Sequence, residues 1–220
     1  MSPTKWRILV GMVTDYSLYL VADAAYTAGR DLAGLVEAAV DGGVTVVQLR
    51  AKSLPRKAAI GLGLELSRRL AAMGVPLLVN DLPDVALACG AAGVHLGQDD
   101  MPIPLARSLL GPGATIGVSV NTPAEARQAE REGADYVGAG PAFITSTKMT
   151  ELTVLGPGGI GHIVRATRLP VVAIGGIDAR NAAEIARAGA GGIAVVSAIL
   201  GAPDVRRAAQ ELKRAFLEKP

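Results

Sequence analysis

The sequence predicts an α/β fold, a single (β/α)₈ TIM barrel, on three observations. Short β-rich runs alternate with longer segments of helical periodicity eight times, which is the count of a closed barrel. The length of 220 residues suits one such barrel. Half of the residues are hydrophobic but only 3% are aromatic, so the core must be aliphatic, as in parallel strands covered by helices. An open doubly wound sheet is the alternative, but it would more often have about five to seven strands.

The predicted elements alternate strictly along the chain. Residues 1–17 are expected to form an N-terminal extension, and residues 18–220 the barrel and catalytic domain. Strands are expected at Leu18–Val21, Thr45–Leu49, Leu77–Val79, Gly93–Leu96, Thr115–Val118, Tyr136–Gly138, Val171–Ile174 and Ile193–Val196. Helices are expected at Asp31–Val40, Pro55–Met73, Val85–Ala88, Ile103–Leu110, Pro123–Arg131, Gly158–Ala166, Ala179–Ala188 and Asp204–Leu217.

Several residues indicate where these helices begin and end. Thr122, followed by Pro123 and Glu125, is typical of an N-cap with proline in the first helical position. A glycine follows five of the helical segments, where a left-handed backbone is favoured. These glycines are Gly42, Gly74, Gly90, Gly133 and Gly189.

Composition and charge exclude several classes of protein. The 22 basic and 20 acidic residues are interspersed and leave a net charge of +2, without the basic tract of a nucleic-acid-binding protein. No apolar stretch is long enough to span a membrane. The apolar run after Arg7 is too short for a signal peptide, and the single cysteine, Cys89, excludes an intrachain disulfide framework. We therefore expect a cytoplasmic protein, and a homo-oligomer is compatible with the sequence.

Functional residues in such barrels lie on the loops after the strands. The second strand runs into Gln48–Lys52, and side-chain alternation directs Gln48 and Arg50 towards the barrel mouth. An arginine fork, the Lys52 ammonium and an amide suit a phosphorylated ligand. An ordinary loop held by salt bridges is the alternative.

Carboxylates follow the third and fourth strands. Asn80-Asp81 lies at the end of the third strand, and Asp99-Asp100 follows the fourth. Magnesium is typically held by one or two carboxylates together with substrate phosphates, so Asp81 and one of the following pair are candidate Mg²⁺ ligands. Two helix N-caps are the alternative. His95 has no spaced histidine or cysteine partner, so a structural or supporting role is favoured over zinc binding.

The later strands carry anion ligands. Ser119 ends the fifth strand and can bind a phosphate oxygen or cap the next helix. The sixth strand leads into a long loop that contains Thr145, Ser146, Thr147 and Lys148. Gly175-Gly176 and Val196-Ser197 follow strands seven and eight, where barrels frequently bind phosphate. Two anion sites predict two phosphorylated substrates or one bisphosphate.

These motifs together resemble the thiamine-phosphate synthase family. The resemblance extends from Leu18 to about Phe216 and is carried by Leu18–Val21, Gln48–Lys52, Asn80-Asp81, GVHLGQDDM at Gly93–Met101, Gly117–Val120, GPAFITSTK at Gly140–Lys148, Ala173–Ile177 and Val195–Ile199. It implies a transferase reaction in which a pyrimidine-methyl diphosphate and a thiazole phosphate give thiamine phosphate and diphosphate. The family chemistry implies that diphosphate leaves first and that the thiazole nitrogen attacks the resulting cation.

The resemblance also implies roles for individual residues. Asp81 and Asp100 would ligate Mg²⁺, and Arg50, Ser119 and Lys148 would be the catalytic residues. The substrate-binding set would be Gln48, Leu49, Arg50, Ala51, Lys52, Asn80, Ser119, Thr145, Ser146, Thr147, Lys148, Gly175, Gly176, Val196 and Ser197. The first six of these would hold the pyrimidine diphosphate, whereas Thr145, Thr147 and the residues after strands seven and eight would hold the thiazole phosphate.

The chain departs from the family pattern at a few positions. Ala51 stands where an acidic residue is frequent, Leu82 where arginine is usual, and Asn121 where histidine is frequent; Ile144 and Ser146 replace two prolines. A thiazole tautomerase shares the fold and the phosphate site, but does not need Asp81, Asp100 and the Thr145–Lys148 loop. A non-catalytic sensor of phosphorylated ligands is a third alternative, against which an intact metal site argues.

Overall fold

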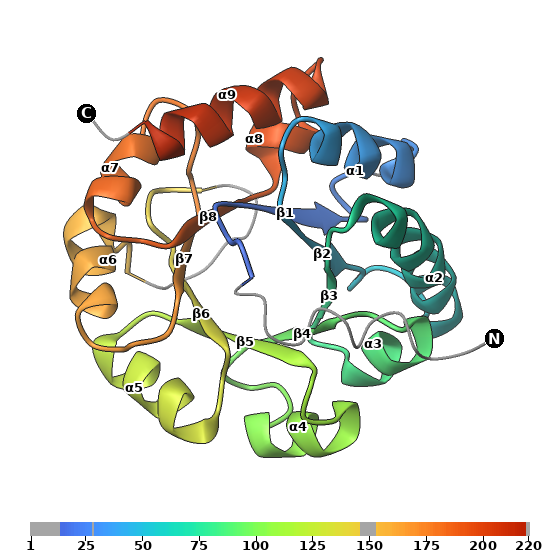
Figure 1. The fold of residues 1–220 in the computed structure, drawn as a ribbon, viewed down its shortest axis with the longest axis horizontal. Helices are drawn as coiled ribbons and strands as arrows, with labels where there is room; N and C mark the ends of the chain where they lie inside the picture. The colour runs from blue at the N-terminus through green and yellow to red at the C-terminus, as the bar shows by residue number, and fades with distance from the viewer. Residues whose placement is uncertain (1–13, 28, 146–152, 219–220) are drawn as a thin grey trace.

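The computed structural model describes residues 14–27, 29–145 and 153–218 and forms a closed barrel of eight parallel strands (Figure 1). Each strand pairs with the next, and β8 closes the barrel against β1. The predicted fold is thus confirmed. The strands are β1 (Leu18–Asp23), β2 (Val46–Arg50), β3 (Leu77–Asn80), β4 (Gly93–Leu96), β5 (Thr115–Val120), β6 (Tyr136–Ala139), β7 (Val171–Ile174) and β8 (Gly192–Val195).

Helices surround the barrel and cover its outer face (Figure 1). They are α1 (Leu32–Asp41), α2 (Arg56–Met73), α3 (Pro83–Cys89), α4 (Ile103–Leu110), α5 (Pro123–Glu132), α6 (Gly156–Val164), α7 (Ala182–Arg187), α8 (Ser197–Leu200) and α9 (Val205–Leu217). The sequence did not predict α8, because one helical turn is too short to show a periodicity. Of the N-terminal extension, residues 1–13 lie outside the described part of the chain.

One helix end differs from its prediction. Gly74, Gly90, Gly133 and Gly189 have positive φ as expected. Gly42, in contrast, has φ −81° and continues the right-handed turn of α1. The left-handed residue is the next one, Gly43, with φ 107°. A glycine is needed at position 42 for a steric reason instead, because a Cβ atom there would lie 2.3 Å from the carbonyl oxygen of Arg206.

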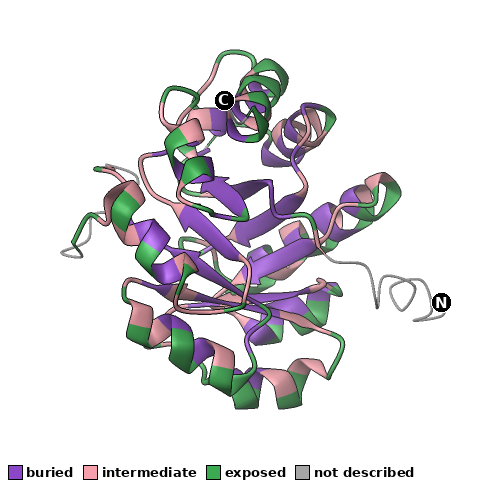
Figure 2. Ribbon diagram, turned by 60° about the vertical axis from the view of Figure 1, so that its left-hand side comes forward, coloured by how far each residue is buried: buried purple, intermediate pink, exposed green. Residues whose placement is uncertain are grey.

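The core has an inner and an outer part. Alternate strand residues point outwards and pack with the helices, and Cys89 is buried among them as expected. Inward-pointing strand residues and Tyr16, which precedes β1, form a second cluster inside the barrel: Tyr16, Tyr19, Val21, Val46, Leu78, Tyr136, Val172 and Ala194. Figure 2 shows this buried centre with exposed residues on the outward sides of the helices.

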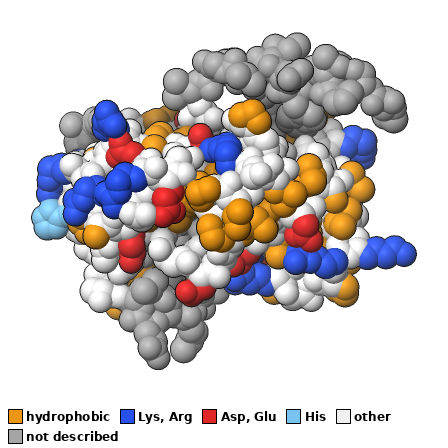
Figure 3. All heavy atoms as spheres, turned by 90° about the horizontal axis from the view of Figure 1, so that it is seen from below, with side chains coloured by type: hydrophobic (Ala, Val, Ile, Leu, Met, Phe, Trp, Pro, Cys, Tyr) orange, Lys and Arg blue, Asp and Glu red, His pale blue; other side chains and the backbone are white. Residues whose placement is uncertain are grey.

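The surface carries charges of both signs. On the face shown in Figure 3, basic and acidic side chains lie interspersed rather than gathered in a patch of one sign. Several are paired, such as Arg168 with Glu130 and Arg180 with Asp178. Among the described residues, no helix is both long enough and apolar enough to cross a membrane.

Candidate active site

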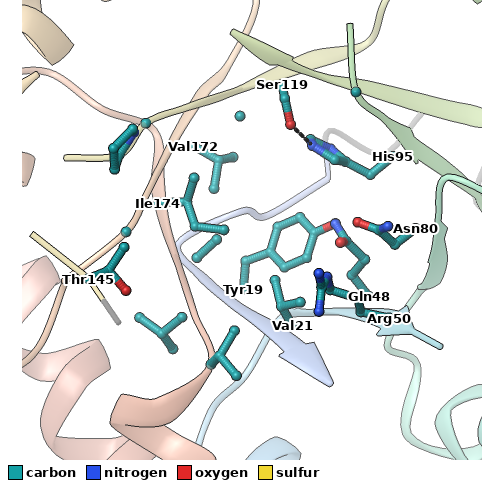
Figure 4. Close-up of a pocket in the computed structure, with 18 of the residues that line it drawn as sticks. Tyr19, Val21, Gln48, Arg50, Asn80, His95, Ser119, Thr145, Val172 and Ile174 are labelled. Carbon is teal, nitrogen blue, oxygen red and sulfur yellow. Dashed lines mark hydrogen bonds between the residues drawn. The ribbon is translucent and has the colours of Figure 1, made fainter. Parts of the chain in front are cut away.

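A cavity of about 810 Å³ opens at the carboxyl ends of the strands. Residues far apart in the sequence meet there because all eight strands run in the same direction. Its lining includes twelve of the predicted site residues: Gln48, Arg50, Lys52, Asn80, Asp81, Asp100, Ser119, Thr145, Gly175, Gly176, Val196 and Ser197. In Figure 4, Gln48, Arg50 and Asn80 lie on one side of this cavity and Thr145 lies on the other.

The end of β2 contributes alternate residues to the cavity. Gln48 and Arg50 line it, as strand alternation predicts. Leu49 and Ala51 are buried in the outer core, so their side chains do not reach it. Arg50 forms an ion pair with Asp23 at the end of β1, a partner that the sequence analysis did not identify. This ion pair orients the guanidinium at the rim of the cavity.

Asp81 follows β3 in an unusual backbone conformation. Its φ of 63° is the only positive value for a non-glycine residue in the described part of the chain. Its amide donates to the carbonyl of His95, and its carboxylate forms a 2.6 Å ion pair with Lys52. Burial opposes ionisation of this carboxyl, but Lys52 and the neighbouring Asp100 together outweigh burial and lower the pKa of Asp81. The carboxylate is therefore held in its charged form.

Asp100 lies next to Asp81, and both residues line the cavity. One of its carboxylate oxygens accepts a 2.7 Å hydrogen bond from the amide of Gly97. Burial raises the pKa of Asp100, and the nearby carboxyl of Asp81 raises it further. The structure thus selects Asp100 over Asp99 as the carboxylate facing Asp81. Neither Asp81 nor Asp100 is an N-cap, since Leu82 and Pro102 occupy those positions in α3 and α4.

The two facing carboxylates fit a hard divalent cation. They repel each other when both are ionised, and this repulsion adds to burial in raising the pKa of Asp100; a bound cation would relieve the repulsion. Among the described residues, no three His, Cys, Asp or Glu side chains cluster as in a closed metal site. Mg²⁺ does not require such a cluster, because it commonly retains water and binds substrate phosphates.

Asn80 has an amide group suited to a ligand. It lines the cavity, and its amide nitrogen is buried without a hydrogen-bond partner among the described residues. A buried donor left unpaired costs free energy, which a polar ligand can recover. Asn121, by comparison, is engaged within the protein, because its side chain donates to the carbonyl of Gly140 at 2.9 Å.

Ser119 is held by His95, whose imidazole Nε2 lies 3.0 Å from the serine Oγ (Figure 4). The other ring nitrogen lies 2.8 Å from the hydroxyl of Tyr136, which in turn lies 2.9 Å from the hydroxyl of Tyr19. The supporting role expected of His95 agrees with these contacts. No functional role for either tyrosine was predicted from the sequence. Their signal was the rarity of aromatics, since the chain has only four tyrosines and these two occupy strands.

The loops after β6, β7 and β8 form the other side of the cavity. Gly175 and Gly176 both have positive φ, and a Cβ at Gly176 would lie 2.4 Å from the carbonyl oxygen of Ile144. These glycines therefore let the β6 loop approach, and they also line the cavity with Val196 and Ser197. Thr145 lies at the edge of this loop, whereas Ser146, Thr147 and Lys148 fall outside the described residues.

Comparisons with known proteins agree on one family. A family model described as thiamine monophosphate synthase matches residues 18–199. A thiamine-phosphate synthase from Chloroflexus aurantiacus is 48% identical over 204 residues, which cover 93% of this chain and 94% of that relative. A protein of the same name from Syntrophomonas wolfei is 46% identical over 92% of this chain and 97% of its own length.

Solved structures give the same result. The chain is similar to a thiamine phosphate pyrophosphorylase from Pyrococcus furiosus, with a TM-score of 0.85 and 39% identity over 93% of this chain and 97% of that one. A 3-hexulose-6-phosphate synthase aligns with a TM-score of 0.67 over 91% of this chain and 99% of that one, at 17% identity. The latter likeness extends to the fold alone.

Proposed function

This chain belongs to the thiamine monophosphate synthase family, and on this premise we propose that it is a thiamine-phosphate synthase. The reaction joins 4-amino-2-methyl-5-(diphosphooxymethyl)pyrimidine to a thiazole phosphate and gives thiamine phosphate and diphosphate. The observation that carries the proposal is the Asp81–Asp100 carboxylate pair, which lies beside Lys52 in a cavity large enough for two small substrates. A cytoplasmic location accords with this activity.

The diphosphate substrate belongs on the β2–β5 side of the cavity. Arg50 and Lys52 supply positive charge, and Gln48, Asn80 and Ser119 supply polar contacts. The side chains of Leu49 and Ala51 point into the core, so any contact they make is through the backbone. Asp81 and Asp100 would hold Mg²⁺, which when bound supplies Lewis-acid stabilisation of the leaving diphosphate.

The thiazole phosphate belongs on the opposite side. Gly175 and Gly176 let the backbone approach an anion, and Val196 and Ser197 lie at the start of α8. Thr145 faces the same space from the β6 loop. We extend this site to Ser146 and Thr147, whose hydroxyl groups suit a phosphate, and we assign the ammonium group of Lys148 to the diphosphate.

The chemistry requires stabilisation of charge more than acid–base catalysis. The bond from the methylene carbon to the diphosphate oxygen breaks and its electron pair leaves with diphosphate. The thiazole nitrogen then forms the new bond to that carbon. Arg50, Ser119 and Lys148 would stabilise the negative charge that develops on the leaving group. The cavity walls would hold the two rings close enough for attack.

A turnover assay with purified protein tests this function. With Mg²⁺, the pyrimidine diphosphate and the thiazole phosphate, we expect thiamine phosphate and diphosphate in equal amounts, and no product when a chelator removes the metal. Isomerisation of a thiazole phosphate without condensation would identify a tautomerase instead. Ligand binding with neither reaction would identify a sensor, and either result would reject the proposed synthase.

A further inference from the structure

A continuous chain of hydrogen bonds crosses the floor of the cavity. The Gln48 amide nitrogen lies 2.7 Å from the Tyr19 hydroxyl, which lies 2.9 Å from the Tyr136 hydroxyl. The Tyr136 hydroxyl lies 2.8 Å from Nδ1 of His95, whose Nε2 lies 3.0 Å from Ser119 Oγ. These five residues, here called the relay, come from five different strands. Four are labelled in Figure 4: Gln48, Tyr19, His95 and Ser119.

Only one order of donors and acceptors along the relay gives every donor in it an acceptor. The amide nitrogen of Gln48 can only donate, so the Tyr19 oxygen accepts from it. Tyr19 then has its own proton to donate, and within the described residues the Tyr136 oxygen is the acceptor within reach. Tyr136 in turn has a proton to donate to His95, so Nδ1 of that ring is an acceptor.

The direction continues to the serine. When Nδ1 of His95 accepts, the neutral ring carries its proton on Nε2. Nε2 therefore donates to Ser119 Oγ, and the serine does not need its own proton for this contact. Ser119 lines the cavity, so its hydroxyl proton can point to a ligand there.

We propose that Gln48, Tyr19 and Tyr136 fix the Nε2-protonated tautomer of His95 and thereby make Ser119 a hydrogen-bond donor to the leaving diphosphate. Tyr19, Tyr136 and His95 are positioning residues, because they act through Ser119. The proposal rests on the proposed function only for the identity of the anion. In the opposite order, Tyr136 would donate to Tyr19, which already accepts from Gln48. The Tyr19 hydroxyl proton would then have no acceptor among the described residues.

Two glycines make room for the relay. A Cβ at Gly117 on β5 would lie 2.4 Å from the Tyr136 hydroxyl oxygen, and one at Gly138 on β6 would lie 2.9 Å from the His95 ring. The rings of Tyr136 and His95 therefore rest against strand positions that have no side chain. Tyr19 and Tyr136 are both about 1% exposed, so protein atoms enclose their side chains almost completely.

The burial of the tyrosines also preserves their protons. Burial raises the pKa of both Tyr19 and Tyr136 well above the ordinary value for tyrosine. Both hydroxyls consequently stay protonated over the pH range in which an enzyme works. The relay then keeps the same direction throughout that range.

Nitrogen-15 NMR of the histidine rings in the ligand-free protein tests the relay. The chain has only two histidines, and His162 is exposed, so a His162→Gln variant assigns the spectrum. Long-range proton–nitrogen correlations distinguish a ring protonated on Nε2 from one protonated on Nδ1. We expect Nε2 protonation of His95 in the wild type. Protonation on Nδ1 would overturn the proposal without any reference to turnover.

Tyr136→Phe removes the donor to His95 and keeps the ring. We expect it to produce a mixture of tautomers and to lower kcat by about tenfold, the loss expected from one weakened contact to the leaving group, with little change in KM. Mg²⁺ with inorganic diphosphate should also inhibit this variant more weakly. Unchanged tautomer and unchanged kcat in a folded Tyr136→Phe protein would contradict the relay.

Tyr16→Phe is the matched control. The ring centroids of Tyr16 and Tyr136 lie 4.7 Å apart. The Tyr16 hydroxyl, however, forms a hydrogen bond with the side chain of Thr14 and takes no part in the relay. We expect this variant to keep the wild-type tautomer and kcat. A loss of kcat as large as that of Tyr136→Phe would indicate a general effect of the aromatic cluster and would reject the relay. If Tyr136→Phe does not fold, the wild-type spectrum alone decides the direction.

Discussion

At the scale of single residues, Asp81 combines features typical of a functional site. Its left-handed backbone is uncommon for a non-glycine residue and costs about 1–3 kcal/mol. Such a conformation persists only where the surroundings hold it, here the amide bond to His95 and the ion pair with Lys52. The result is a charged carboxylate directed at Asp100. A helix cap would need neither the strain nor the facing carboxylate.

The two carboxylates give a direct prediction for catalysis. Asp81→Ala and Asp100→Ala should each lower kcat by roughly 10²-fold or more, because the leaving diphosphate loses its metal-mediated stabilisation. Steady-state rates measured over a range of Mg²⁺ concentrations check this. Asp99→Ala, which removes the exposed neighbouring carboxylate, should stay close to wild type. Near-normal rates in both of the first two variants would exclude them as metal ligands.

The polar residues of the site could be predicted from sequence far better than the aromatic ones. Gln48, Arg50, Asn80 and Ser119 are conspicuous because a polar residue at a strand end has little reason to be in a core. Tyr136 lies in a strand, where an aromatic residue is expected to be a packing residue. The sequence around it does not indicate that its hydroxyl contacts a residue on another strand. Leu49 was included with its motif, although strand alternation directs its side chain away from the cavity.

At the scale of elements, local sequence predicted the helix ends that depend on local bonds. Thr122 and Glu125 form a capping box at the start of α5, in agreement with the predicted N-cap. The last turn of the same helix also makes a tertiary contact. Glu130 accepts hydrogen bonds from the Thr167 hydroxyl and from Arg168, both in the segment between α6 and β7. The sequence gives no local sign of this connection.

The contact of Glu130 predicts a dependence of stability on pH. The hydrogen bonds from Thr167 and Arg168 lower the pKa of Glu130 from 4.5 to about 2. A pKa lowered by folding contributes stability that is present above pH 4.5 and is lost as the pH falls towards 2. Glu130→Gln should therefore lower Tm at pH 7, with a difference from wild type that shrinks at acid pH.

Thermal unfolding followed by circular dichroism at pH 7 and pH 3 measures this effect. Glu132→Gln provides the control, because Glu132 lies on the same helix and bonds only within it, to Gln128, in the described contacts. Its difference from wild type should be small at both pH values. A Glu130→Gln difference that is the same at pH 7 and pH 3 would show that ionisation of Glu130 is not involved.

At the scale of the whole molecule, the barrel must close both in its sheet and in its ring of helices. β8 pairs with β1, and α9 packs against α1 next to this junction (Figure 1). At the end of α1 the two helices come close together at Gly42, where a Cβ would meet the Arg206 carbonyl oxygen at 2.3 Å and the Ala209 Cβ at 2.7 Å. Gly42 therefore permits the first and last helices to pack together.

This close approach predicts the effect of one added methyl group. Gly42→Ala should destabilise the protein by about 1–3 kcal/mol, because the backbone of α9 must move. Its φ of −81° is acceptable for alanine, so the cost arises from packing alone. Urea unfolding measures it, with Gly113→Ala as the control in open space, expected within about 0.5 kcal/mol of wild type. Equal stability of the two variants would refute the packing role of Gly42.

The sequence by itself determined the alternation of strands and helices, the barrel they form, and the strand ends at which polar ligands gather. These features follow from the periodicity of each segment and from the order of strands and helices, both of which can be recognised along the sequence. The tertiary structure alone decided which groups meet: Asp23 with Arg50, Asp100 with Asp81, and Tyr136 with His95. Such pairs depend on distances between different strands, and no local pattern in one sequence records them.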